Sequence, residues 1–162
     1  HTVRSENNEK KMLATKHDLS GLPDPDTDSQ FYDGVPFKRL LAWFIDIIII
    51  LLISMALVVG TFGLGAFMYP LLLLISNFGY RIFTLTRNSA TLGMIIAGIE
   101  IRNGRGEKLT LSEAAWHTSI YLIVFVFMFG IIISMIMMLV NKRGQGIHDY
   151  FVGTTAINRP KI

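Results

Sequence analysis

The sequence predicts an all-α membrane protein with two transmembrane helices, a third helix that either spans the bilayer or re-enters it, and a small β-hairpin outside the bilayer. The first observation is that 51% of the 162 residues are hydrophobic, more than the core of one soluble domain requires. The second is that these residues gather into three apolar runs of about twenty residues, the length that crosses the hydrocarbon core of a bilayer. Lipid is therefore expected to cover much of this apolar surface.

Charge divides the chain into a polar tail and a basic membrane part. Residues 1–36 hold seven Asp or Glu and four Lys or Arg, whereas the rest of the chain holds five and eleven. The tail has too little apolar area to offset the entropy of ordering it, so residues 1–36 are predicted to form a disordered, acidic tail. The chain begins at His1 and its first methionine is Met12, and one hypothesis is that residues 1–11 are a cloning remnant.

The sequence lacks the motifs that would indicate several other functional classes. The lysines and arginines lie beside the apolar runs, as juxtamembrane anchors do, so no nucleic-acid partner is expected. The sequence contains no cysteine and no nucleophile elbow, phosphate-binding glycine loop or zinc-binding His/Glu motif. We therefore expect neither an enzyme nor a bound cofactor or metal, and the bilayer itself is the expected environment.

The first two helices follow from length and polarity. Residues 40–59 contain Asp46 and Ser54 as their strongly polar residues, and twenty helical residues span roughly 30 Å. A short uncharged turn with three glycines then leads to residues 64–83, which end in a segment with two arginines. The second helix is predicted to run antiparallel to the first.

A short strand pattern follows the second helix. Residues 99–102 alternate polar and apolar side chains and meet Asn103-Gly104, a pair typical of tight turns. Residues 107–110 follow directly. This pattern predicts a β-hairpin outside the bilayer.

The third apolar stretch, residues 120–140, has two interpretations. A capping-box signal at Thr110 predicts the start of its helix. One straight span would put the basic C-terminal residues on the face opposite the other basic segments, against the positive-inside rule. A fold-back near Gly130, buried against protein, would bring all basic segments to one face and let residues 154–157 pair with the predicted strand 99–102. A straight helix is the commoner structure, and both alternatives stay open.

Charged residues within or beside the apolar runs are the candidate functional residues. Arg39 and Asp46 are seven residues apart, so they share a helix face with Asp46 roughly 10 Å deeper, and they do not touch. An aspartate inside a span is either a proton or cation site or one half of an ion pair. Ser76 and Asn77 could add oxygen ligands beside it, although hydrogen bonding between helices is the commoner role. His148 could make exchange pH-dependent.

These residues carry a resemblance to a known family. The quoted motifs are Phe37-Lys38-Arg39-Leu40-Leu41-Ala42-Trp43-Phe44-Ile45-Asp46, Ala90-Thr91-Leu92-Gly93 and Gly146-Ile147-His148-Asp149 with Gly153-Thr154. In their order and type they resemble the RDD family, named for one arginine and two aspartates. The resemblance covers residues 36–158, places a membrane domain at 37–158 and leaves 159–162 as a C-terminal tail. By position, the naming residues correspond to Arg39, Asp46 and Asp149.

The resemblance implies a bacterial cell-membrane protein for which transport is the usual proposal, and cation/proton antiport is attributed to some members. On this basis Arg39, Asp46 and Asp149 are expected to form a charge network that couples protons to a monovalent cation. A homo-oligomer is expected because three spans enclose little pathway. The inner membrane, with the tail and hairpin in the cytoplasm, is the expected location. The alternative is a non-transporting scaffold or accessory subunit in which the same three residues lock the helices together.

Overall fold

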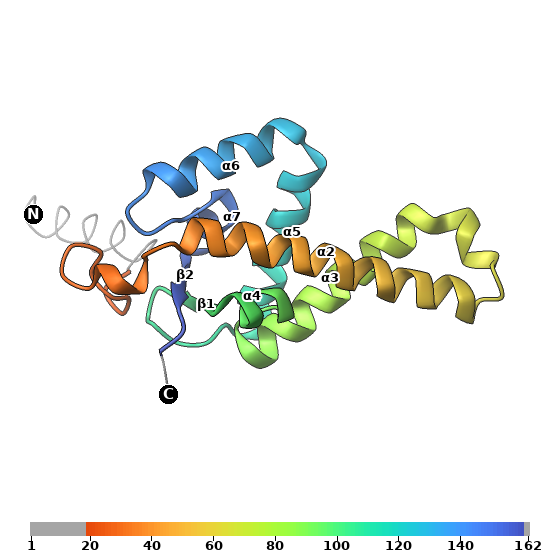
Figure 1. Cartoon of the computed structure of the whole chain (residues 1–162), viewed down its shortest axis with the longest axis horizontal. Helices are drawn as coiled ribbons and strands as arrows, with labels where there is room; N and C mark the ends of the chain where they lie inside the picture. The colour runs from red at the N-terminus through yellow and green to blue at the C-terminus, as the bar shows by residue number, and fades with distance from the viewer. Residues whose placement is uncertain (1–18, 161–162) are drawn as a thin grey trace, which may run out of the picture.

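The computed structural model describes residues 19–160, which form a long helical hairpin attached at one end to a smaller body (Figure 1). Helix α2 (Val35–Gly60) runs out along the hairpin, the 3-10 helix η2 (Leu64–Met68) lies in its turn, and helix α3 (Tyr69–Asn88) returns beside α2. The elements of the smaller body are η1 (Ser29–Phe31), α4 (Leu92–Ala97), β1 (Ile99–Asn103), α5 (Leu111–Val126), α6 (Met128–Val140), α7 (Ile147–Val152) and β2 (Thr154–Asn158).

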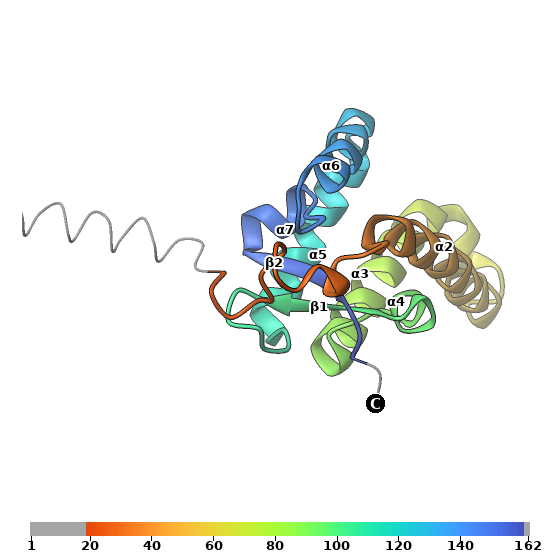
Figure 2. The ribbon, with the colours of Figure 1, turned by 60° about the vertical axis from the view of Figure 1, so that its left-hand side comes forward.

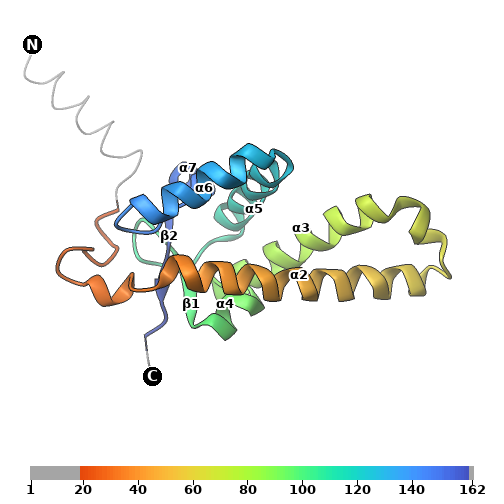
Figure 3. The same cartoon turned by 45° about the horizontal axis from the view of Figure 1, so that its top comes forward.

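Two helical segments, Ser29–Gly60 and Leu64–Asn88, are long and apolar enough to cross a membrane. Helix α2 begins after Gly34, whose φ of 70° is left-handed, and Pro36 occupies its first turn, where a missing N–H leaves no hydrogen bond unmade. Figure 3 shows that α2 and α3 extend together well beyond every other labelled element. Many of their apolar side chains there are exposed, as they are in helices that lie in a bilayer. Both predicted transmembrane helices are confirmed.

A two-stranded antiparallel sheet lies at the other end of the hairpin. Strand β1 pairs with β2, which places Ile101 opposite Ala156, and both side chains are fully buried. The predicted partner, residues 107–110, is not a strand but leads into α5 through a capping box at Thr110. Leu109 of this segment is buried in the core and its N–H donates to the Ser89 hydroxyl, whereas the backbone groups of β1 pair with β2. The small sheet is therefore confirmed. The predicted hairpin is wrong about its second strand, and the pairing of residues 154–157 with 99–102 that the fold-back alternative predicted is confirmed.

The hydrophobic core lies under this sheet rather than along the hairpin. Helices α2 and α4 and both strands contribute most of it. Its buried members are Val35, Ala42, Leu85, Ala90, Met94, Ile99, Ile101, Leu109, Ala114 and Ala156.

The third apolar stretch is a bent pair of helices. Helices α5 and α6 meet at Phe127, whose backbone is extended, and the chain direction changes there by 118°. Strand β1 precedes α5, strand β2 follows α7, and the two strands pair. The chain therefore enters and leaves the α5–α6 pair at the same end of the molecule (Figure 2). A straight third span is not formed, and the fold-back alternative describes this geometry, with its break three residues before Gly130.

The segment from residue 19 to residue 34 is more ordered than the predicted tail. The N–H of Gly21 donates to the carbonyl of Gly104 at 3.0 Å. The side-chain amide of Asn158 donates to the carbonyls of Gln30 and Asp33, at 2.8 and 2.9 Å. These bonds need no apolar area, which is why composition alone predicted disorder. Residues 1–18, including the hypothesised cloning remnant, lie outside the described residues.

The bent pair predicts which residues share one side of the membrane. Single-cysteine variants Arg105→Cys and Lys142→Cys, made in this cysteine-free sequence, carry exposed side chains before and after the pair. A membrane-impermeant maleimide should label both from the same side of a sealed vesicle. Phe62 is 98% exposed and lies in the turn between α2 and α3, so Phe62→Cys should label only from the other side. Labelling of residue 142 together with residue 62 would show that the pair crosses the bilayer.

Candidate functional site

The first arginine–aspartate pair joins the start of α2 to α7. Arg39 Nη1 donates to Asp149 Oδ2 at 2.5 Å, and both side chains are buried. Asp149 also accepts from the N–H of Gly146 at 3.1 Å and from the Thr154 hydroxyl at 3.0 Å, and its Oδ1 lies 3.1 Å from His117 Nε2. One carboxylate therefore connects α2, α5, α7 and the start of β2.

Arg39 keeps the carboxyl group of Asp149 ionised. Burial alone would raise the pKa of Asp149, but the Arg39 guanidinium holds that pKa well below the usual carboxyl range. His148 Nε2 lies 3.5 Å from Asp149 Oδ2. Burial lowers the pKa of His148 well below that of a free imidazole, so this ring is neutral at physiological pH. Arg39 is consequently the counter-charge of Asp149.

The second carboxylate, Asp46, lies about two turns further along α2 and holds α3 and α4 against it. Its Oδ1 accepts from the Tyr80 hydroxyl at 2.6 Å and from the N–H of Gly93 at 2.9 Å. Its Oδ2 accepts from the Thr91 hydroxyl at 2.6 Å. Both oxygens of this buried carboxylate are therefore occupied by donors from neighbouring elements.

Helix α4 can approach Asp46 only because residue 93 is glycine. A Cβ on Gly93 would lie 2.2 Å from the carbonyl oxygen of Ala42 and 2.8 Å from Asp46 Oδ1. Both distances are shorter than any van der Waals contact, and the first atom belongs to the backbone of α2. Gly93 thus sets the closeness of α2 and α4.

Arg81, on α3, is the counter-charge of Asp46. Its Nη1 lies 4.0 Å from Asp46 Oδ2, and its Cζ lies 3.8 Å from the ring centroid of Tyr121, a cation–π distance. Only 3% of Arg81 is exposed. The sequence interpretation treated it as the end of the second helix and missed this role. The available signal was its position inside the apolar run, where an arginine needs a partner.

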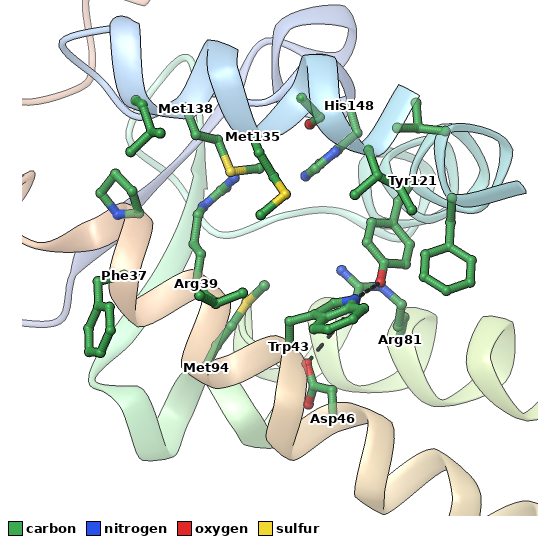
Figure 4. Close-up of a pocket in the computed structure, with 17 residues that line it drawn as sticks. Phe37, Arg39, Trp43, Asp46, Arg81, Met94, Tyr121, Met135, Met138 and His148 are labelled. Carbon is green, nitrogen blue, oxygen red and sulfur yellow. Dashed lines mark hydrogen bonds and ion pairs between the residues drawn. The ribbon is translucent and has the colours of Figure 1, made fainter. Parts of the chain in front are cut away.

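A cavity of about 370 Å³ lies between α2 and the α5–α6 pair (Figure 4). Its walls are mostly apolar, with Trp43, Met94 and Met135 among the lining residues. The polar lining consists of Arg39, Asp46, Arg81, Ser134 and His148. One space thus touches members of both arginine–aspartate pairs.

A family model described as the RDD family matches residues 34–153. This chain belongs to the RDD family. No curated protein and no solved structure matches the chain. Family and fold agree on an RDD membrane protein, and the three naming residues Arg39, Asp46 and Asp149 all lie inside the matched region.

The sequence predicted one charge network in this RDD domain. In the structure, its residues belong to two separate arginine–aspartate pairs. Arg39 and Asp46 do not touch, as predicted from their spacing. Arg39 binds Asp149, whereas Asp46 lies beside Arg81. The sequence prediction grouped Arg39, Asp46 and Asp149 in one network and did not include Arg81.

Two of the predicted auxiliary residues of the RDD site, Ser76 and Asn77, are close in sequence to Arg81. Ser76 and Asn77 lie one helical turn before Tyr80 and Arg81 on α3. Ser76 Oγ and Asn77 Oδ1 are buried and have no hydrogen-bond partner within the part of the chain that the structure describes. Neither is bonded to Asp46.

Three buried residues of the RDD domain have the spacing of a metal site. Ligand atoms of His117, His148 and Asp149 all lie within 4.8 Å of one another. The Arg39 guanidinium, however, already neutralises Asp149, and both oxygens of that carboxylate accept hydrogen bonds. We interpret Asp149 and His117 as hydrogen-bonded partners, with the His148 ring packed against His117.

Replacing Gly93 should loosen the RDD fold. Gly93→Ala places a methyl group against the α2 backbone, and overpacking of this kind typically costs about 1–3 kcal/mol. The unfolding temperature in detergent, followed by circular dichroism, should therefore fall. Gly79→Ala is the matched control, because a Cβ at residue 79 meets no atom within 4 Å. Equal unfolding temperatures for the two variants would contradict the close approach of α4.

Proposed function

We propose that this RDD protein is a membrane transporter whose working site is the cavity with the Arg81–Asp46 pair on its wall. The observation that carries the proposal is the pair itself. Charged side chains buried among transmembrane helices are costly and mark ion or proton pathways. The 4.0 Å between Arg81 Nη1 and Asp46 Oδ2 exceeds a direct hydrogen bond, so the two groups can separate without breaking one.

The specific reaction we propose is exchange of a monovalent cation for a proton, with Asp46 as the coupling carboxylate. Arg81 balances Asp46 in the state described here. In the alternate state, a proton or a cation would balance it. Ser76 Oγ and Asn77 Oδ1 have no hydrogen-bond partner among the described residues, and they are oxygen atoms of the hard type that monovalent cations such as Na⁺ prefer. The Arg39–Asp149 pair would hold the surrounding helices in place during the cycle.

We also propose the inner membrane of a bacterial cell, with the sheet end of the molecule in the cytoplasm. The basic residues at the end of α3 and on either side of the α5–α6 pair lie at this end, including Arg87, Arg105 and Lys142. The opposite turn, residues 61–68, carries no charge. This asymmetry is the one that the positive-inside rule associates with a cytoplasmic face.

Cation-driven collapse of a proton gradient in proteoliposomes tests the exchange. We expect the wild-type protein to respond to at least one of Na⁺, K⁺ and Li⁺, and Asp46→Asn to abolish the response because an amide does not titrate. Tyr80→Phe is the matched control: it removes one hydrogen bond from Asp46 but keeps the carboxylate, so flux should persist. Flux that survives in a folded Asp46→Asn protein would exclude Asp46 as the coupling group.

The second candidate is a non-transporting scaffold or accessory subunit, and a specific observation favours it. Asp149 and Asp46 each bind donors from several elements, as residues that lock a fold would. In a scaffold, Asp46→Asn should loosen the protein, since removing one partner of a buried pair costs about 3–5 kcal/mol. No flux from a folded, correctly inserted wild-type protein would select this candidate. The acidic N-terminal tail, residues 1–36, or the end of the molecule that carries the sheet would then be the first place to look for a partner.

We propose a homo-oligomer for the transporting protein, because two spans and one bent pair enclose little pathway and the cavity described here is small. Photobleaching steps of labelled protein in lipid vesicles should show more than one subunit in each transport-competent vesicle. The count must be made at low protein-to-lipid ratio, with flux measured in the same preparation. Flux from vesicles that hold one subunit would contradict the oligomer and leave the exchange proposal standing.

A further inference from the structure

Two buried arginines present unused hydrogen-bond donors at the cavity. Arg39 uses Nη1 on Asp149, but its Nε and Nη2 have no partner among the described residues, and neither has Nε of Arg81. The two residues are 8% and 3% exposed. Buried guanidinium donors left without acceptors are costly. A bound molecule that supplies acceptors would remove this cost.

The groups that face the cavity favour an anion as the source of these acceptors. Arg39, Arg81 and Asp46 line the cavity, whereas Asp149 is not part of its lining. Asp149 balances the charge of Arg39 through Nη1 alone and leaves its other two donors free among the described residues. The oxygens of Asp46 are occupied by three donors, whereas the arginines have donors to spare. Guanidinium groups in such a position match the oxygens of a phosphate or carboxylate.

The opening of the cavity is apolar. Phe37 on α2 and Leu139 on α6 belong to its lining, yet they are 73% and 75% exposed. Met135 and Phe125 are also part-exposed lining residues. These side chains belong to helices whose exposed surface contacts lipid. Figure 4 shows Arg39 and Arg81 reaching the same space from α2 and α3.

The volume limits what the cavity can hold. About 370 Å³ lies near the lower end of the range for small-molecule sites, roughly 300–1,000 Å³. A polar headgroup fits this space and a complete lipid does not. The acyl chains of a bound lipid would have to lie outside, along the exposed apolar residues at the opening.

From this geometry we infer that the cavity binds the phosphate of an anionic phospholipid from the bilayer, held between Arg39 and Arg81, with the acyl chains leaving past Phe37 and Leu139. The methionines of the wall can adapt to a variable headgroup. A zwitterionic lipid has the same phosphate, but its quaternary ammonium group is repelled by both guanidinium groups. The inference goes beyond ion exchange and holds for a transporter or a scaffold alike.

Tryptophan fluorescence can test the inference, because Trp43 lines the cavity. The sequence contains two tryptophans, and the second, Trp116, is 64% exposed. Trp116→Phe therefore leaves Trp43 as the reporter in the full chain. Phosphatidylglycerol brominated near the headgroup end of its chains should quench Trp43 at about tenfold lower mole fraction than brominated phosphatidylcholine, the size expected for one hydrogen bond to a charged group.

A matched pair of variants in this background locates the site. Arg81→Gln removes a cavity arginine and should abolish most of the preference for phosphatidylglycerol. Arg87→Gln removes the same charge from an exposed position in the last turn of the same helix and should leave the preference unchanged. Equal loss in both variants would show a general surface-charge effect and overturn the inference.

Two further measurements keep the inference testable if Arg81→Gln does not fold. Equal quenching of the Trp43 reporter by both lipids would overturn the inference without any cavity variant. Addition of inorganic phosphate distinguishes the source of the anion. If phosphate at millimolar concentration reverses the quenching by phosphatidylglycerol, the site takes a free anion and the lipid assignment is wrong. Persistent quenching supports the lipid.

Discussion

The fold of this RDD protein depends on the bond between Arg39 and Asp149. The two residues are 110 positions apart, and their pairing attaches the end of the RDD region to the first turns of the first span. Asp149 also accepts hydrogen bonds from the N–H of Gly146, which precedes α7, and from the hydroxyl of Thr154, the first residue of β2. Removal of one partner would leave the other charge buried and unpaired, which costs about 3–5 kcal/mol. The sheet and the bent helix pair are both placed by this contact.

The second pair has a different character. Asp46 is satisfied mainly by neutral donors, and Arg81 remains 4.0 Å away, over the ring of Tyr121. The first pair is thus a direct bond that fixes helices, whereas the second is a loose ion pair at the edge of a space. The two aspartates therefore differ in how they are paired, although the family name treats them alike.

Local signals in the sequence predicted local structure well. The lengths of the apolar runs predicted α2 and α3, and the Thr110 capping box lies where the sequence indicated. The hairpin was wrong because Asn103-Gly104 is a local turn signal, whereas the true partner strand begins 50 residues later and is chosen by burial. Arg81 was missed for a related reason. Its role depends on α2 and α5, and no spacing within α3 reveals either neighbour.

The return of the α5–α6 pair to its starting side has a consequence for how the protein is made. In the described chain, the turn between α2 and α3 is the end of the hairpin far from the sheet, and residues 61–68 contain no charged side chain. In the orientation proposed above, the insertion machinery would have to translocate this one short, neutral loop of the described chain. The arginines and lysines of the described chain would then stay where they were synthesised, and the bent pair would enter the membrane without carrying a polar segment across.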